Sequence, residues 1–300
     1  MSLMGGLGNQ LFQLATGLEV SRRASAPLEL DLSWFGQGLR RTSGGLILRP
    51  YDLHGIADDI PKSTAGKGQL SRLARQAQDA TARRAGRAAR RLPLRTYYES
   101  GDRFDPRALG VPPGTRLRGY FSSWRYFPSV ATEMRRRVLE GPSRSPRSLM
   151  RAPEALSGPF LALHVRRGDY LTLTSTYGLV APDYYRRAVG ALLDLGYRGP
   201  IWLFSDDPRG ALEFLQGAVT IDHVVEPPKE SSSVESLVLM SAASALVIAN
   251  STYSWWAAFL RDAPDRPVIA PRPLWRDPSM SDGRDWLLPH WLTVDCRTFN

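Results

Sequence analysis

The sequence predicts an α/β fold, and two observations in its second half support that prediction. Residues 160–165 and 201–207 begin with apolar runs and have strand length, and each is followed by a segment with helical spacing of its apolar residues. The alternation continues through further strands at 245–248 and 267–271. Because repeated strand–helix units form parallel sheets, we expect a doubly wound parallel sheet with ligands bound beyond the carboxyl ends of its strands.

The first half opens on a glycine-rich turn at residues 5–10, which leads into a helical pattern over 11–19. Alternating leucines at 26–35 then predict a strand. The strand that should precede the turn is reduced to residues 1–4. We therefore expect either that the true start lies upstream or that the chain has been trimmed, and that the edge of the first sheet is weak.

A linker is expected between the two halves. Residues 141–159 are rich in Pro, Gly and Ser, which is typical of a connection between domains. The sequence thus predicts two domains, 1–150 and 151–300.

The charge balance favours anionic partners. The 300 residues include 39 Lys and Arg against 29 Asp and Glu, a formal net charge of +10, which suits nucleotide phosphates, nucleic acid or an acidic membrane. Much of the excess lies in residues 67–95, which lack the interleaved aromatic residues that stacking on bases requires. We interpret this segment first as a solvated helix face and second as a peripheral contact with anionic lipid, with no nucleic-acid partner.

The sequence also indicates a compartment. Cys296 is the single cysteine, which excludes an internal disulfide and suits a reducing environment. No run approaches the roughly 18 apolar residues of a membrane span, and the first residues lack a signal-peptide pattern. We expect a cytoplasmic protein, either free or peripheral on the inner face of the membrane.

The strongest polar cluster, "HVRRGDY" at 164–170, follows the strand at 160–165. Alternate residues of a strand share a face, so His164 and Arg166 should point together. Burying such cations is costly unless an anion binds, and arginine suits bidentate contact with phosphate. Because two arginines are present, phosphate binding is preferred over an Arg–Asp ion pair, with Asp169 orienting one arginine.

A second polar cluster, Asn250 to Thr252, follows the strand at 245–248 and begins a helical segment. The Ser251 and Thr252 hydroxyls and the N–H groups of a helix start can cap the helix or cradle a phosphate. Capping is favoured when the cluster is taken alone. Phosphate binding gains support from Arg166 in the same predicted sheet.

The acidic pair Asp206 and Asp207 ends the strand at 201–207. It could bind a metal, contact a base or ribose, or cap the helix starting at Pro208. Metal binding is the weakest of these interpretations, because the pair lacks Asp-x-Asp spacing and no His-Glu-x-x-His pattern exists. We expect no metal or other cofactor. An ATPase is excluded because no Gly-x-x-x-x-Gly-Lys-Ser/Thr loop is present.

Taken together, these motifs resemble those of the bacterial α-1,2-fucosyltransferases, glycosyltransferase family 11. The resemblance rests on "GGLGNQLFQ", "HVRRGDYL", "APDYYRRAV", "FSDD" and "LMSAASALVIANSTYSWWAAFL", and it is weak from 34 to 156. It implies a GT-B fold, in which two Rossmann-like domains face each other across a cleft. It also implies metal-independent, inverting transfer of L-fucose from GDP-fucose to the 2-hydroxyl of a galactoside glycan.

The resemblance also implies roles for individual residues, and the motifs add others. By resemblance Arg166 would hold the β-phosphate of GDP, the Ser251 and Thr252 hydroxyls would contact phosphate, and Asn9 would approach donor and acceptor. Arg167 is interpreted as mainly structural. Together, the predicted catalytic residues are Arg166, His164 and Asn9. The predicted donor-binding set is Gly8, Asn9, Gln10, His164, Arg166, Asp169, Asp206, Asp207, Glu235, Asn250, Ser251 and Thr252.

For several of these residues the sequence is compatible with more than one role. The glycine-rich turn is equally well interpreted as a tight structural turn. The family has an Asp where this chain has Ser236, so the adjacent Glu235 would have to read guanine. The general base is not identified, and Asp31, Glu99, Asp102, Asn9 or a water are candidates. The aromatic segment 117–127 indicates either a sugar site or interface packing.

Three other functions remain as alternatives. The first is an inverting transferase for another nucleotide sugar, the second a basic nucleic-acid-binding protein, and the third a nucleotide-sugar binder without activity.

Overall fold

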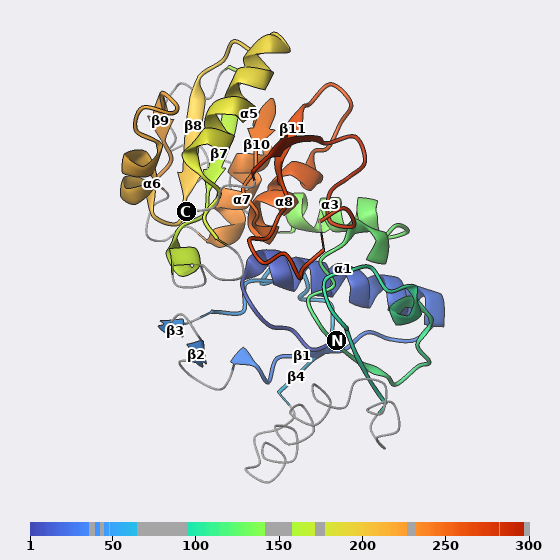
Figure 1. Cartoon of the computed structure of the whole chain (residues 1–300). Helices are drawn as coiled ribbons and strands as arrows, with labels where there is room; N and C mark the ends of the chain where they lie inside the picture. Colours follow the sequence, from blue (N-terminus) through green and yellow to red (C-terminus); the bar gives the residue numbers. More distant parts are fainter. Residues whose placement is uncertain are drawn as a thin grey trace. The chain divides into compact units, whose positions relative to one another are not determined.

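The computed structural model describes residues 1–35, 40–42, 45–47, 49–64, 95–141, 158–171, 178–226, 232–281 and 283–296, with the backbone alone for 40–42 and 45–47. The chain divides into two compact units (Figure 1), namely Met1–Arg40 with Leu48–Met134, and Arg41–Ile47 with Arg135–Asn300. Nearly all of the basic segment 67–95 and the predicted boundary at residue 150 lie outside the described residues. The division into 1–150 and 151–300 therefore stays a prediction.

The second unit is built on a six-stranded parallel sheet. In spatial order its strands are β12 (Leu292–Asp295), β11 (Val268–Arg272), β10 (Ala245–Val247), β7 (Leu161–Val165), β8 (Ile201–Ser205) and β9 (His223–Val224). The helices that alternate with them are α5 (Pro182–Asp194), α6 (Pro208–Leu215), α7 (Ser233–Ser241) and α8 (Thr252–Leu260). The predicted parallel α/β sheet is confirmed.

The strand order reverses direction between β7 and β10. From β7 the chain runs outward through β8 and β9, then returns to β10 and runs outward on the other side through β11 and β12. Such a reversal is the switch point of a doubly wound sheet, and ligands bind in the crevice that it leaves beyond the strand ends. The polar clusters at 164–170 and 250–252 follow the two strands that flank this point.

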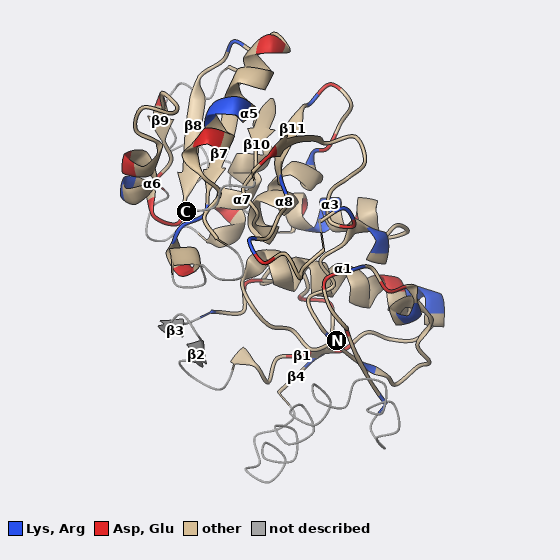
Figure 2. Cartoon of the chain, in the orientation of Figure 1, with Lys and Arg blue, Asp and Glu red and all other residues tan. Residues whose placement is uncertain are grey.

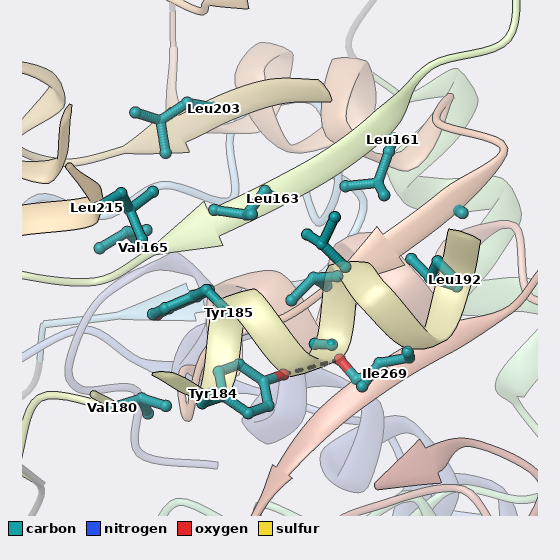
Figure 3. Packing of buried hydrophobic residues seen from close by; sticks show 14 of the residues in the cluster. Leu161, Leu163, Val165, Val180, Tyr184, Tyr185, Leu192, Leu203, Leu215 and Ile269 are labelled. Carbon is teal, nitrogen blue, oxygen red and sulfur yellow. Dashed lines mark hydrogen bonds between the residues drawn. The ribbon is translucent and has the colours of Figure 1, made fainter. Parts of the chain in front are cut away.

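The core of the second unit fixes the orientation of β7. This strand is buried along its whole length, and its side chains alternate between the two faces of the sheet. Leu161, Leu163 and Val165 pack in one hydrophobic cluster with Tyr185 of α5 (Figure 3). His164 consequently faces the opposite side of the sheet.

Tyr184 links α5 to the sheet by hydrogen bonding. Its hydroxyl lies 2.7 Å from the carbonyl oxygen of Ile248 and 3.0 Å from that of Ile269, so it can donate to either. Figure 3 shows the second of these contacts. The helix is thereby held against β11 and against the residue that follows β10.

The first unit has shorter elements. The helix α1 (Leu7–Ala24) is followed by β1 (Leu30–Asp31), which pairs in parallel with β4 (Lys62–Ser63). A second parallel pair consists of β5 (Thr96–Tyr98) and β6 (Arg116–Arg118). Of the strand predicted at 26–35, only β1 is regular.

The remaining described elements are short or stand apart from these sheets. They are the two-stranded sheet of β2 (Arg40–Thr42) and β3 (Gly45–Ile47), the helix α3 (Ala131–Glu140), and the 3-10 segments η3 (Pro106–Gly110), η4 (Trp124–Tyr126) and η6 (Gly168–Leu171).

The first residues take the place of the strand that is almost missing from the sequence. Ser2 forms an isolated parallel bridge with Asp31, and the Ser2 N–H donates to the carbonyl of Leu117 in β6 (3.0 Å). The Leu3 N–H donates to the Asp31 carbonyl (3.1 Å). Residues 2 and 3 thus join β1 to β6, so the predicted strand–turn–helix–strand opening is confirmed in a very short form.

Both units are of the α/β type that the GT-B class combines. The predicted fold class is confirmed to that extent, and the cleft between the domains stays a prediction. No helix in the described ranges combines the length and the apolar character needed to cross a membrane.

Candidate active site

The predicted polar residues of the second unit gather at the carboxyl ends of β7, β8 and β10. Figure 2 shows basic and acidic stretches next to each other where β7 and β8 end. His164 lies within β7, the two arginines follow it, and Asp206 and Asp207 follow β8. The sheet therefore brings together residues that are about 40 positions apart in the sequence.

His164 is buried and uncharged. Its side chain is 3% exposed, and within the described residues its Nδ1 has no hydrogen-bond partner. Burial, with a smaller effect from Arg166, lowers the pKa of His164 to about 3. The imidazole therefore adds no positive charge at neutral pH, and it can act only as a neutral hydrogen-bonding group.

Two carboxylates hold the guanidinium group of Arg166. Its Nε and Nη2 donate to Asp169 Oδ1 at 3.0 and 2.6 Å, and its Nη1 lies 3.0 Å from Asp206 Oδ2. Burial acts to lower the pKa of Arg166, but Asp206 and Asp169 outweigh it and raise the pKa above its usual value. The guanidinium is thus permanently charged and fixed in direction.

Arg167 is held separately. Its Nε donates to Asp207 Oδ2 (3.1 Å), and its backbone N–H donates to Asp206 Oδ1 (2.9 Å). The guanidinium carbon also lies 5.2 Å from the centre of the Phe214 ring, within cation–π range. These contacts agree with a structural role for Arg167.

The ion pairs bear on one alternative from the sequence. Both arginines form Arg–Asp pairs, with Asp169, Asp206 and Asp207, and phosphate binding by Arg166 stays a prediction. The five side chains carry a formal excess of one negative charge. What the site offers an anion is a fixed array of N–H donors rather than a surplus of cations.

Two glycines leave room for the acidic pair. A Cβ on Gly168 would lie 2.2 Å from Asp206 Oδ2, and a Cβ on Gly210 would lie 2.2 Å from Asp207 Oδ2. Asp207 is also the N-cap of α6, where it accepts the Gly210 N–H (3.1 Å). This N–H and then Arg167 lower the pKa of Asp207. Helix capping, one of the three interpretations of the pair, is therefore confirmed for Asp207.

The second cluster contributes a helix start. Ser251 is the N-cap of α8, and its Oγ accepts the Tyr253 N–H (3.3 Å). Thr252 is the first residue of α8 and is half-buried. The N–H groups and positive dipole end of this helix lie at the switch point, which favours an anion there.

Asn250 differs from the expectation. Its side chain is 1% exposed, and its Nδ2 donates to the carbonyls of Leu274 (3.0 Å) and Gly178 (3.4 Å). This amide nitrogen therefore holds loops together, and a contact of Asn250 with the donor stays a prediction. The Asn250 carbonyl accepts a hydrogen bond from the Tyr170 hydroxyl (2.9 Å), which links the two polar clusters. Tyr170 lies within the "HVRRGDY" motif, but the motif alone gives no sign of this contact.

Glu235 caps a helix as well. Its Oε2 accepts the Ser232 N–H (2.7 Å) while its own N–H donates to Ser232 Oγ (3.3 Å), which forms a capping box at the start of α7. A sequence signal for this role existed, because Ser followed three residues later by Glu is the pattern of a capping box. Contact with guanine would compete with this cap and stays a prediction.

The turn residues of the first unit separate into two roles. Gln10 is fully buried. Its Nε2 donates to the carbonyls of Gly5 (3.0 Å) and Pro50 (2.9 Å), and its Oε1 accepts the Asp52 N–H (2.9 Å). These contacts occupy the amide and give Gln10 a structural role, while its predicted contact with the donor is not tested.

Gly8 is buried within α1, whereas Asn9 is half-buried. Gly5 has a φ of 81°, and a Cβ there would lie 2.6 Å from Asn9 Nδ2. The turn thus requires glycine at position 5 in order to seat the Asn9 side chain. Asn9 keeps its predicted role, and nothing in the first unit alone tests it.

Comparisons with known proteins agree with the arrangement. The model of glycosyl transferase family 11 matches residues 106–295, more than half of the chain. The O-antigen biosynthesis glycosyltransferase WbnK of Escherichia coli is 36% identical over 114 residues, 37% of this chain and 37% of that protein. The alpha-1,2-colitosyltransferase of Escherichia coli is 23% identical over 301 residues, 98% of this chain and 97% of that protein.

A vertebrate relative shares a shorter region. The pig (Sus scrofa) galactoside alpha-(1,2)-fucosyltransferase 2 is 26% identical over 192 residues, which cover 57% of this chain and 53% of the pig protein. The chain therefore spans about a third of the first of these relatives and about half of the pig protein.

Proposed function

Because the chain belongs to glycosyltransferase family 11, we propose that it transfers L-fucose from GDP-β-L-fucose to the 2-hydroxyl of a galactoside, with inversion, in the synthesis of a surface glycan. One observation carries the proposal, namely the guanidinium of Arg166 fixed by Asp169 and Asp206 at the switch point of the sheet. A diphosphate bound there would meet this guanidinium and the start of α8.

The proposed chemistry follows from where charge develops. As the bond between the anomeric carbon and the β-phosphate oxygen breaks, negative charge grows on the departing GDP. Arg166 and the N–H groups at the start of α8 would stabilise that charge without reorganising, because packing and ion pairs already hold them. The neutral imidazole of His164 would donate one hydrogen bond at most, depending on its tautomer.

Fucose is supported by the name of the pig relative, and a related sugar has support of its own. The colitosyltransferase aligns along 98% of this chain, and colitose is fucose without its 3-hydroxyl. GDP-colitose is therefore the second candidate donor. A site that hydrogen-bonds the 3-hydroxyl of fucose would reject colitose strongly, because the polar group meant for that hydroxyl would stay unpaired.

A transfer assay tests the proposal. GDP-fucose and GDP-colitose are each offered with a panel of galactosides, and the linkage of the product is determined. An α-1,2-linked fucoside from a β-linked donor supports the proposal. If colitose is transferred and fucose is not, the donor sugar is colitose and the fucose part of the proposal is wrong. If GDP, UDP and ADP shifted the melting temperature equally, guanine recognition would be wrong, and salt-dependent binding of RNA or DNA would favour the nucleic-acid alternative.

Transfer is expected to continue in excess EDTA. The carboxylates that could have formed a metal site are occupied, since Asp206 pairs with Arg166 and Asp207 with Arg167. Arg166 would provide the positive charge that a divalent ion gives in metal-dependent transferases. The rate is measured before and after dialysis against EDTA. A loss of activity that added Mg²⁺ or Mn²⁺ restores would contradict the metal-free mechanism.

Gly168→Ala is expected to weaken GDP binding about tenfold, a cost of about 1.4 kcal/mol. The new Cβ would lie 2.2 Å from Asp206 Oδ2, so the carboxylate must move and release one side of Arg166. Titration with GDP measures the loss. Gly190→Ala in α5 is the matched control, because a Cβ there meets nothing within 4 Å. That control should gain about 0.5–1 kcal/mol of stability and keep its GDP affinity. Equal affinities in the two variants would show that Asp206 does not position Arg166.

A peripheral contact with anionic membrane also stays a prediction. The segment on which it rests, 67–95, lies almost wholly outside the described residues.

A further inference from the structure

Glu99 occupies a position in the first unit that resembles that of the phosphate site in the second. It directly follows β5, and its N–H donates to the carbonyl of Arg118, the last residue of the parallel strand β6 (3.0 Å). The carboxylate therefore lies at the carboxyl end of a parallel strand pair, the edge where α/β sheets place ligand-binding groups. Its side chain is half-buried.

The backbone of residues 119–121, which directly follow β6, is adapted to the Glu99 carboxylate. Glu99 Oε2 accepts the N–H groups of Tyr120 (2.7 Å) and Phe121 (2.9 Å). Phe121 has a φ of 52°, a left-handed conformation that is costly for a bulky residue. At Gly119 a Cβ would lie 2.4 Å from the Glu99 Cβ and 2.6 Å from Oε2. Strained backbone that orients one side chain is typical of functional sites.

Glu99 differs from the carboxylates of the first unit that serve structure. Glu19 is fully buried and accepts hydrogen bonds from the Ser129 N–H (2.9 Å), the Ser129 hydroxyl (2.7 Å) and Arg23 (2.7 Å). Asp105 pairs with Arg107 and accepts the Tyr97 hydroxyl (2.7 Å). In the described part of the chain, Glu99 has no such cation, and its hydrogen bonds reach Oε2 alone.

Burial and the missing cation change how Glu99 titrates. Burial, with a smaller contribution from Asp102, raises the pKa of Glu99 to about 7 against the lowering effect of the two N–H groups. Asp102 is the charged neighbour that acts on it from the same segment, and Arg118 is the basic residue whose backbone it contacts on β6. A carboxylate with a pKa near the working pH is both ionised and basic enough to accept a proton.

The other acidic candidate with described contacts is occupied on both oxygens. Asp31 Oδ1 accepts the Ser33 N–H (3.0 Å) and Oδ2 accepts the Ser2 hydroxyl (3.3 Å). Its Oδ2 also lies 3.9 Å from Arg116 Nε. These contacts join the short strands of the sheet and leave Asp31 a structural role.

We propose that Glu99 is the general base of the transfer reaction, an inference that rests on the function proposed above. The acceptor hydroxyl oxygen attacks the anomeric carbon, its proton passes to Glu99 Oε1, and the bond from carbon to the β-phosphate oxygen breaks, so that GDP leaves with the bonding electrons. Glu99 then releases the proton to water. Tyr120, whose backbone N–H binds the carboxylate, is 45% exposed and would provide an aromatic surface for the acceptor sugar. Phe121, Tyr126 and Phe127 of the aromatic segment are buried and serve packing.

The test compares Glu99→Gln with the unchanged chain. Gln can accept the same two N–H groups through its amide oxygen but cannot take a proton. We expect kcat for transfer to fall about 10²–10⁴-fold while GDP affinity stays the same. The unchanged chain should lose activity below about pH 7, because protonation removes the base. The variant should lack that dependence, and Glu99→Asp should keep it with a reduced rate.

Stability measurements separate catalysis from folding. The pKa of Glu99 in the folded chain lies above its ordinary value of 4.5. The contribution of Glu99 to the stability of the folded chain is thus present below pH 4.5 and lost as the pH rises through about 7. Glu99→Gln should therefore melt no lower than the unchanged chain at pH 8. Glu19→Gln is the matched control, and it should melt lower while its pH–rate profile stays unchanged.

Two outcomes overturn the proposal in distinguishable ways. If the unchanged chain transfers sugar and Glu99→Gln does so within threefold and with the same pH profile, Glu99 is not the base although the proposed function stands. If the unchanged chain transfers neither sugar to any galactoside, the proposed function fails, and the role of Glu99 fails with it.

Discussion

Replacing Arg166 by alanine is expected to lower kcat for transfer about 10³-fold, which corresponds to about 4 kcal/mol of transition-state stabilisation. The guanidinium is fixed by Asp169 on one edge and Asp206 on the other, so its direction is set before a donor binds. Preorganised charge of this kind acts on the leaving group as its negative charge develops. The rate is measured at saturating donor and acceptor.

Arginine-to-lysine variants at the two adjacent positions provide the control for this prediction. Alanine at position 166 leaves Asp169 and Asp206 without their cation, whereas lysine keeps the charge but cannot bridge two carboxylates and a phosphate at once. We therefore expect Arg166→Lys to lose most of the activity with little loss of stability. Arg167→Lys should lose less than tenfold, because Arg167 is paired with Asp207 and lies against Phe214. Equal losses at 166 and 167 would contradict the separate roles.

The sequence predicts the strand ends well because those signals are local. A buried run followed by polar residues marks where β7 and β10 end, and the parallel sheet then brings those ends together. The strand order, with β7 beside β10, depends on pairing between residues more than 80 positions apart. No local pattern specifies that order, so the switch point becomes visible only in the folded unit.

The ion-pair and hydrogen-bond partners of the predicted residues could mostly not be predicted from the sequence. Arg166 and Asp206 are 40 positions apart, and nothing near either residue indicates the pair. His164 is a candidate phosphate ligand as a strand residue, but only its burial shows that it is neutral. Glu235 is the opposite case, because its capping partner Ser232 lies within the same turn and could have been predicted from the residue pattern.

Glu99 illustrates a different limit. In the sequence it is one acidic residue among several, and neither β5 nor β6 exceeds three residues. The features that distinguish it are a left-handed Phe121, the close approach of Gly119 and the missing cation. All three depend on the packing of β6 beside β5, so the structure identifies the candidate where the sequence left several.

Gln10→Leu is expected to destabilise the first unit by about 3 kcal/mol, because leucine leaves three part-buried backbone groups without their partner. These groups are the carbonyls of Gly5 and Pro50 and the N–H of Asp52. The Gln10 side chain that pairs with all three is fully buried. Denaturant unfolding measures the loss, and transfer should fall only in proportion to the folded fraction.

Asn9→Ala is the matched substitution at the next position in the same helix. Its side chain is half-buried and lies over Gly5, so its removal should change stability by less than about 1 kcal/mol. Transfer should nevertheless fall at least tenfold if Asn9 has the catalytic role that the family resemblance implies. The two variants thus separate folding from catalysis within one motif. The buried amide of Gln10 indicates a structural role, and the accessible amide of Asn9 indicates a catalytic one. A large loss of stability from Asn9→Ala, or a loss of rate from Gln10→Leu in fully folded protein, would contradict this assignment.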